Sequence, residues 1–579
     1  MSAPLAAPGA VAPLNAEAGR WSAGQAAVAL AIAAFLLAFL IWPVLTVIRV
    51  AVTEPDGSLT LSHFGSFFQL SLMRESFANS LYVAGMTVVL ATLIAVPLAY
   101  ITVRFRFRGA ILIQTLGVLP LIMPAFMGAA AMQLLFGRSG SVNQLLGQWF
   151  GFTLPIMEGL KGVIFVETLH YFPFILLNLS AALANIDSAM EESAQNLGAS
   201  GWRLFRRIVF PLALPGYVAG ASLVFIKVFD DLGTPLVLNV TNMLAPQAYL
   251  RVTSIGIEDP IGYVICFILV GFSIAAMAGS AAFLRGRDFA TLQRGAAAAP
   301  RRDLRPWQAV LAYGWIVGVL LLVLSPHLGI LMLSLSKVWS FTLVPEIWTL
   351  DNYSVVFRDS TRMITNTFLY CGLAALLDVV IGTAIAYLVL RTRVPGRQWL
   401  DHMATVALAM PGVVLGIGYL RTFRDTEIPF TGEALLGSWL IFVLAYTVRR
   451  LPYALRSCNA ALQQVHLSLE EAAQNLGASR ARTIWRVVVP LMAGGILAGF
   501  VTSFITAAVE ISETILLTSR ESLAPMSYGI YLYMQSIAGR GPGAALGVVA
   551  IVMVALGTYL SHRFVAARHA QQFMKGQRP

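Results

Sequence analysis

Two stretches of the chain are nearly identical, and they decide how the rest is interpreted. Residues 191–211 read EESAQNLGASGWRLFRRIVFP, and residues 470–490 read EEAAQNLGASRARTIWRVVVP. They align without gaps at a separation of 279 positions, and 13 of their 21 residues are identical. Chance does not produce such a match, so the chain contains an internal repeat.

The repeat extends upstream of these stretches. Pro173 and Pro452 are also separated by 279 positions, whereas earlier matches are separated by 287, which places one insertion of eight residues between the two regions. The earlier matches pair Asn79, Tyr100, Arg106, Gly109 and Pro124 with Asn366, Tyr387, Arg393, Gly396 and Pro411. The chain is therefore a tandem duplication.

The composition indicates a membrane protein. Of the 579 residues, 58% are hydrophobic and 12% are charged, whereas soluble proteins carry about 25% charged residues. Apolar runs long enough to cross a bilayer are expected at 26–50, 80–103, 110–136, 159–185, 214–238, 259–284, 306–334, 365–390, 399–423, 436–463, 492–517 and 541–566. The predicted fold is all-α, with about 12 transmembrane helices in two tandem six-helix domains of the same orientation.

The positive charges lie between the apolar runs. The formal net charge is +11, and the clustered arginines are Arg104, Arg106 and Arg108 in one loop and Arg391, Arg393 and Arg397 in another. Positive loops face the cytoplasm, so both termini, which fall on the same side, are expected to be cytoplasmic. No basic stretch is interleaved with aromatic residues, so nucleic acid is not an expected partner.

Each repeated stretch predicts two helices joined at a glycine. Ser188 and, one step out of register, Ser468 are candidate N-caps of a first helix. Gly198 and Gly477 suit the left-handed position that ends such a helix. We predict a helix–glycine–helix elbow parallel to the cytoplasmic surface. A connector held at lipid headgroups has no need of a fixed Glu-to-Gly distance in both copies, whereas docking into a partner does.

These residues resemble the signature loop of binding-protein-dependent ABC importer permeases, which reads Glu-Ala-Ala, then Gly, and ends on a hydrophobic residue and Pro. The first copy departs from it only by Ser193 in place of the middle alanine. The resemblance implies that each loop docks on an ATPase subunit, where the Glu engages the ATPase surface and the Gly forms the elbow. The residues that it assigns to coupling are Glu191, Glu192, Ala194, Gly198, Pro211, Glu470, Glu471, Ala472, Ala473, Gly477 and Pro490.

The resemblance also implies the partners. The chain has no GxxxxGK[ST] phosphate loop, so it is expected to be a transporter subunit and no enzyme, with ATP bound only by partner subunits and no cofactor of its own. The expected assembly is this chain, two copies of an ABC ATPase and a periplasmic or lipid-anchored solute-binding protein, in the bacterial inner membrane. The expected divisions are a tail at 1–25, permease domains at 26–285 and 306–567, a cytoplasmic linker at 286–305 and a tail at 568–579.

Ionisable groups within spans are costly and usually face a cavity or a partner. The candidates for the translocation pathway are Asp230, Asp231, Glu510, Glu513, Arg449 and Arg450. The carboxylates are equally compatible with a structural role, and the arginines with ion pairing or with an anion path. His170 occupies the repeat position of Arg449 and is expected to be a hydrogen-bonded core residue. The three cysteines and the other candidate ligands have no metal-ligand spacing, so no bound metal is expected.

The substrate is suggested by resemblance alone. The segments DDLGTPLVL (230–238) and VRRLPYALRS (448–457) look like those of permeases for iron(III) and 2-aminoethylphosphonate. Iron(III) is the first expectation, and 2-aminoethylphosphonate, thiamine or a sugar phosphate is the alternative. A secondary transporter that binds protons or Na⁺ at the acidic residues is the alternative from another class. The duplicated elbows argue against it, because such a transporter has no ATPase to dock.

Overall fold

The computed structural model describes residues 22–106, 109–284, 302–339, 342–429, 431–536 and 538–575. Most of the tail expected at 1–25, most of the linker expected at 286–305 and the last residues of the tail expected at 568–579 lie outside this part of the chain.

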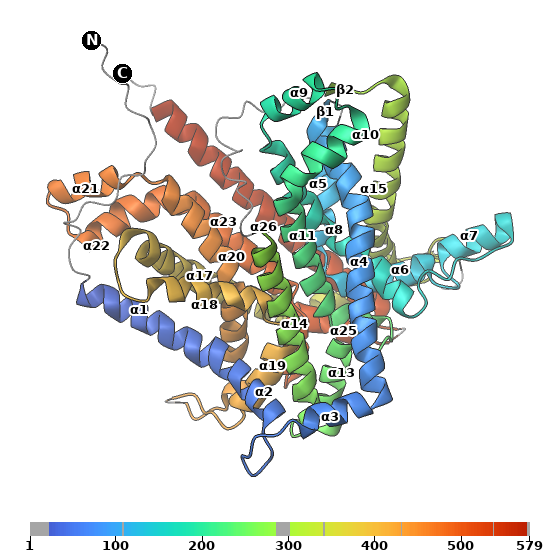
Figure 1. Cartoon of the computed structure of the whole chain (residues 1–579). Coiled ribbons are helices and arrows are strands. Elements are labelled where there is room, and N and C mark those ends of the chain that lie inside the picture. Colours follow the sequence, from blue (N-terminus) through green and yellow to red (C-terminus); the bar gives the residue numbers. More distant parts are fainter. Residues whose placement is uncertain are drawn as a thin grey trace.

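The first half begins with a membrane-length helix and contains a run of short elements around the elbow (Figure 1). Its helices are α1 (Ala23–Leu36), α2 (Trp42–Val52), α3 (Ser62–Gln69), α4 (Ser71–Arg104), α5 (Ala110–Val118), α6 (Ala125–Phe136), α7 (Ser141–Phe150), α8 (Leu160–Ala184), α9 (Ser188–Asn196), α10 (Gly201–Leu204), α11 (Phe210–Phe229), α12 (Gly233–Val237), α13 (Leu244–Leu250) and α14 (Pro260–Leu284). Short 3-10 or π-helical turns join them at η1 (Leu37–Ile41), η2 (Leu119–Ile122), η3 (Phe205–Val209) and η4 (Arg251–Ile255).

The second half has the same order of elements. Its helices are α15 (Pro306–Ser334), α16 (Asp351–Asp359), α17 (Thr361–Arg391), α18 (Arg397–Val406), α19 (Gly412–Thr422), α20 (Leu440–Gln464), α21 (Leu467–Asn475), α22 (Arg480–Thr483), α23 (Val489–Ala508), α24 (Ser512–Leu517), α25 (Met526–Met534) and α26 (Arg540–Lys575). Its short turns are η6 (Ala407–Ala409), η7 (Leu435–Gly437), η8 (Ile484–Val488) and η9 (Glu521–Leu523).

Strands are confined, within the described residues, to two short pairs. β1 (Phe105–Arg106) runs parallel to β2 (Arg302–Asp303), and β3 (Ser336–Val338) runs antiparallel to β4 (Ile347–Trp348). The repeat is preserved element by element, since α21, α22, η8 and α23 each begin 279 positions after α9, α10, η3 and α11. The all-α membrane fold with two homologous halves is therefore confirmed.

Two of the expected spans are broken, and two others end before the residue expected. The helices within 110–136 and 399–423 bend by 104° and 108° at Pro124 and Pro411. The helices within 214–238 and 492–517 end at Phe229 and Ala508, before the short helices α12 and α24. A proline removes a backbone donor and clashes with the preceding turn, and the two bends lie at prolines, although Pro173 and Pro452 stand inside continuous helices.

The number of clear spans is smaller than twelve. The described residues contain nine helices long and apolar enough to cross a membrane, or eleven when each bent pair is taken as one span. The remaining expected span, 436–463, is α20, which carries Arg449, Arg450 and Arg456 and has most of its residues buried. Most of this helix belongs to the protein interior, where Arg449 and Arg450 find partners.

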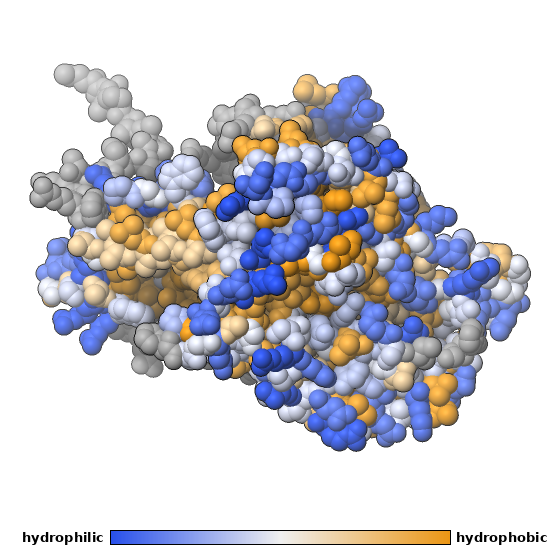
Figure 2. Space-filling model, turned by 90° about the horizontal axis from the view of Figure 1, so that it is seen from below, coloured by the Kyte–Doolittle hydropathy of each residue, from blue (hydrophilic) through white to orange (hydrophobic). Residues whose placement is uncertain are grey.

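The outer surface fits a lipid environment. Large apolar side chains are exposed along the long helices, including Tyr82, Val89 and Leu93 on α4. Figure 2 shows apolar residues gathered broadly on the left of the face seen from below, while hydrophilic residues gather toward its centre and lower right. Such a contiguous apolar surface on a folded protein marks contact with lipid or with another protein.

The first helix of each half packs on the other half. The hydroxyl of Tyr419 in α19 donates to the carbonyl of Phe39 in η1 over 2.6 Å, and α2 packs against α19. In the same way, α15 packs against α6, where a Cβ added at Gly329 would lie 3.1 Å from that of Ala131. Each half therefore contacts the first membrane helix of the other half. Figure 1 shows the bundle around α4, α8 and α11 running in a different direction from the bundle around α17, α20 and α23.

Matched glycines allow close packing beside the elbows. Gly216 and Gly220 in α11 face α8, and Gly495 and Gly499, 279 positions later, face α20. A Cβ added at Gly220 would lie 2.7 Å from the Cα of Ile175. This small-xxx-small spacing lets helix backbones approach each other in membrane proteins.

Gly220→Ala is therefore expected to lower the free energy of unfolding by about 1–3 kcal/mol, as overpacking does. The control is Gly271→Ala in α14, where the new methyl group meets no atom within 4 Å and gains up to about 1 kcal/mol of helix propensity. Thermal unfolding of the two purified variants in detergent measures the difference. Equal stability of both variants would contradict the packing argument.

Candidate functional site

The two elbows have the same backbone geometry. Gly198 and Gly477 both have φ of +85°, which confirms the left-handed position predicted for them. Beyond each glycine, the amide of Ala199 donates to the carbonyl of Ala194 over 2.9 Å, and the equivalent bond, from Ala478 to Ala473, is 3.0 Å. This is the hydrogen bond that closes a helix ending on a left-handed glycine. The chain therefore turns at one fixed place in both copies.

The helix before the glycine begins one residue earlier than expected in the first copy and two residues earlier in the second. The N-cap side chains are Asp187, which accepts from the amide of Ala189 over 2.9 Å, and His466, which accepts from the amide of Ser468 over 3.4 Å. The predicted caps Ser188 and Ser468 were out of register by one position, whereas Asp187 and His466 are 279 apart. The elbow helices thus start at equivalent residues.

The glutamates of each elbow face two ways. Glu192 and Glu471 are exposed, while Glu191 and Glu470 are 6% and 3% exposed. Glu191 lies 2.5 Å from Arg104, and the Glu470 carboxylate accepts from Nε of Arg391 over 2.8 Å. Neither arginine was among the predicted site residues. Arg104 and Arg391 are separated by 287 positions, as Tyr100 and Tyr387 are, so the repeat spacing could have identified them as equivalent residues.

The other residues predicted to act in coupling also include buried and exposed positions. Ala194 is buried, Ala473 is half-buried and Ala472 is exposed. Pro211 and Pro490 lie at the start of α11 and α23, directly after the π-helical turns η3 and η8. The apolar residue before each glycine, Leu197 or Leu476, is 89% exposed in both copies. The outer surface of each elbow therefore presents a carboxylate and an exposed leucine.

A buried ion cluster joins the two halves. Asp230, at the end of α11 in the first half, accepts from Nη2 of Arg449 over 3.2 Å and from the amide of Gly412 over 3.1 Å. Both donors belong to the second half. A side chain at position 412 would collide with the guanidinium of Arg449, so the glycine after Pro411 makes the approach possible.

Within the second half, the cluster continues to two glutamates. Arg449 lies 2.7 Å from Glu510 and 3.4 Å from Glu513, and Arg450 pairs with Glu510. The amide of Ser512 donates to Glu510 over 3.0 Å. Asp231 has other partners, because it accepts from the amides of Gly233 and Thr234 at the start of α12 over 3.3 and 3.2 Å. Five of the six predicted pathway residues therefore form one connected set.

The same residues line a cavity of about 310 Å³ between the halves. Asp230, Asp231, Arg449, Arg450 and Glu510 all contribute to its wall, together with Lys227, Tyr171, Tyr453 and Thr506. Glu513 lies behind Arg449, fully buried. Asp230 and Glu510 are thus both ion-paired and part of the cavity wall, and their role in a translocation pathway stays a prediction.

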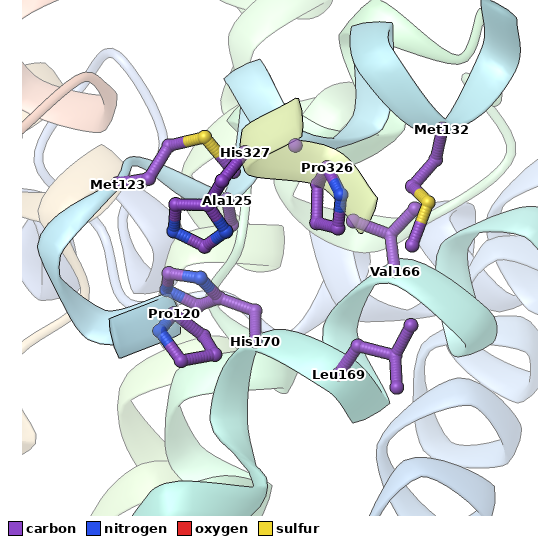
Figure 3. Close-up of a pocket in the computed structure, with 10 residues that line it drawn as sticks. Pro120, Met123, Ala125, Met132, Val166, Leu169, His170, Pro326 and His327 are labelled. Atoms are coloured by element: carbon purple, nitrogen blue, oxygen red, sulfur yellow. The ribbon is translucent and has the colours of Figure 1, made fainter. Parts of the chain in front are cut away.

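The cluster is not duplicated. At the 279-residue separation, Arg449 and Arg450 correspond to His170 and Tyr171 in the first half. His170 lines a second, small pocket with His327 of α15, and Figure 3 shows the two imidazole rings beside each other, near Met123. The pocket has a volume of about 10 Å³, close to the smallest space that holds one water molecule. It is too small to be a solute site.

The described part of the chain contains no group of three or more His, Cys, Asp or Glu residues placed to hold a metal ion.

Comparisons with known proteins agree with the two-part architecture. The chain matches the family described as "Binding-protein-dependent transport system inner membrane component" twice, at residues 87–287 and 378–569. It is 28% identical over 472 residues to the ferric transport system permease protein FbpB of Actinobacillus pleuropneumoniae. This alignment covers 78% of this chain and 66% of that protein. It is 28% identical over 455 residues to the putative ferric transport system permease protein FbpB 1 of Haemophilus influenzae, which covers 77% and 70%.

A crystal structure of a bacterial ABC transporter involved in the import of the acidic polysaccharide alginate aligns with 45% of this chain and 94% of that chain, at 18% identity and a TM-score of 0.38. This chain spans about two thirds of the length of the two ferric permeases. The two family matches together span more than half of the chain, on a fold of two homologous halves, and this protein therefore belongs to the inner membrane components of binding-protein-dependent transport systems.

Proposed function

We propose that this chain is the permease of an ATP-driven importer, with one ATPase subunit docked on each elbow and a solute-binding protein on the opposite face. The observation that carries the proposal is the pair of equivalent elbows, each with an exposed glutamate beside an exposed leucine. An isolated exposed leucine is common, but two at the same repeat position beside a fixed turn fit a docking surface.

The stoichiometry and orientation follow from the same proposal. Two elbows in one chain require two ATPase subunits, and their approach on ATP binding would draw the elbows together. The permease domains would extend over 26–285 and 306–567, with both termini in the cytoplasm of a bacterial cell and the chain in its inner membrane. The positive loops beside α4 and α17 support this orientation.

The cavity between the halves is the proposed solute path. It lies where α8 and α11 of the first half meet α20 and α23 of the second, and residues of both halves line it. The Asp230–Arg449 pair crosses this seam. Relative movement of the two halves would separate these two side chains, so the ion pair between the halves would break and form again with each transport cycle.

Iron(III) is the proposed cargo. Two relatives that align over most of this chain are ferric transport permeases by name, and the segments 230–238 and 448–457, which resemble that group, both contribute to the cavity wall. 2-Aminoethylphosphonate is the alternative that the test below includes.

Replacing both elbow glycines, by Gly198→Val and Gly477→Val, is expected to uncouple ATP hydrolysis from uptake. A β-branched residue at this φ costs about 1–2 kcal/mol, so the helix end would shift. The expected result is a fall of about tenfold in solute taken up per ATP hydrolysed, measured in proteoliposomes that contain the whole complex. Gly57→Val is the matched control, because Gly57 has φ of +86° in a loop outside the elbows. Unimpaired uptake that needs no ATP would contradict the proposed coupling.

Arg449→Met is expected to lower the free energy of unfolding by about 3–5 kcal/mol, because it leaves several buried carboxylates without their cation. Arg456→Met, on the same helix but exposed, should change it by no more than about 0.5 kcal/mol. Thermal unfolding of both variants in detergent checks this. Equal losses of stability in the two variants would show that the ion cluster does not stabilise the contact between the two halves.

The cargo is tested with the complex in proteoliposomes and its solute-binding protein loaded with radioactive iron(III). Accumulation of iron that needs hydrolysable ATP, and that excess 2-aminoethylphosphonate does not reduce, is the expected result. Accumulation of the phosphonate in place of iron would favour the alternative cargo. Uptake driven by an ion gradient without ATP would contradict the importer itself.

A further inference from the structure

The first glutamate of each elbow is turned away from any docking partner. Glu191 and Glu470 are almost fully buried, whereas the adjacent Glu192 and Glu471 are exposed. A buried carboxylate cannot engage the surface of another protein or a lipid headgroup, so these two residues need a role inside the chain.

Their partners are the last residues of the second long helix in each half. Arg104 ends α4 and Arg391 ends α17. The side chains of the first pair are 7% and 8% exposed, and those of the second pair 14% and 3%. Both pairs therefore lie out of water, at the point where the elbow meets the end of a membrane-spanning helix.

Additional contacts strengthen both junctions. Nη2 of Arg391 donates to the carbonyl of Leu462 over 3.1 Å and to that of Val465 over 2.5 Å, and the hydroxyl of Tyr387 donates to Glu470 over 3.4 Å. One guanidinium thus joins the ends of α17 and α20 to the start of α21. In the first half, the rings of Tyr100 and Phe205 lie 5.0 Å apart and join α4 to η3, which directly follows α10.

A buried ion pair is a poor source of stability, because desolvation offsets most of the attraction between the charges. Its best-attested use is to fix one geometry among several. Here the same pair occurs twice, although the separation of the arginines is 287 and that of the glutamates is 279, so the insertion between them left the junction intact. A geometric role explains this repetition better than a stabilising one.

We propose that the Arg104–Glu191 and Arg391–Glu470 pairs make each elbow one rigid lever with α4 or α17, so that ATPase movement enters the membrane through these two helices. Glu191 and Glu470 are positioning residues, and the docking surface consists of their exposed neighbours. The direction of force rests on the proposed function, but the rigidity of the lever does not. Because α4 packs on α8 and α11, and α17 on α20 and α23, the lever reaches the helices that line the cavity.

The rigidity is tested on the purified chain by electron–electron double resonance between spin labels. Labels at Leu476→Cys, on the elbow, and at Leu369→Cys, on α17, use positions that are 89% and 50% exposed, and the three native cysteines are buried. About 33 Å of helix separates position 369 from Arg391, at 1.5 Å per residue, which suits the method. The unaltered elbow should give one narrow distance, and Glu470→Gln should broaden the distribution by roughly a factor of two.

Glu471→Gln is the matched control, since it changes the next residue on the same helix and should leave the distribution narrow. The equivalent labels in the first half are Leu197→Cys and Tyr82→Cys, tested with Glu191→Gln, so the proposal survives if one variant fails to fold. An equally narrow distribution in both glutamine variants would overturn the lever.

A second measurement uses the whole complex in proteoliposomes. Glu191→Gln with Glu470→Gln should leave the ATPase bound and hydrolysing, while uptake per ATP falls by about tenfold. Glu192→Gln with Glu471→Gln should instead weaken retention of the ATPase. If the spin-label distribution broadens as expected but the unaltered chain retains no ATPase, the proposed function fails and the lever stands. Unchanged uptake per ATP in the Glu191 and Glu470 variant would overturn the force path.

Discussion

A guanidinium group buried inside a membrane protein has to be neutralised where it lies, because it does not lose its proton and the surrounding medium does not solvate it. Arg449 meets this constraint with carboxylates from both halves of the chain. That arrangement fixes several other features. The helix that carries Asp230 has to end there, the proline-broken span has to present Gly412 without a side chain, and the helix after Ala508 has to restart so that the backbone can meet Glu510.

The duplication separates what the two halves share from what they divide between them. The elbows are the same down to the φ of their glycines and the bond that closes their first helix. The cavity is different, since the second half supplies two arginines where the first half has His170 and Tyr171. The proposed docking of one ATPase subunit on each elbow would favour preserved equivalence, whereas the proposed single path between the halves can be lined by unequal walls. The charges at the seam are therefore a property of the assembled pair of halves.

The sequence predicted the features that depend on local chemistry. A glycine that suits the left-handed position indicates where a helix ends, so the turns at Gly198 and Gly477 were placed correctly, and long apolar runs indicate where spans lie. It failed where partners are distant. Nothing near Glu191 indicates Arg104, and only the repeat spacing connects the two. The helix ends at Phe229 and Ala508 have no proline beside them. Asp230, next to the first, finds its partners in the other half, whereas Glu510, near the second, pairs with arginines of its own half.

The packing of the first helices limits how the halves can move. α2 packs against α19, and α15 packs against α6, so the first membrane helix of each half lies against the other half. A simple separation of the halves would pull both helices out of close contacts such as Gly418 on Pro43 and Gly329 on Ala131. Rotation about those contacts preserves them while the elbow ends approach or separate. Because the Asp230–Arg449 pair lies between the same two halves, the rotation that the proposed transport cycle requires would change the environment of these charges, and would thereby couple the position of the elbows to the cavity.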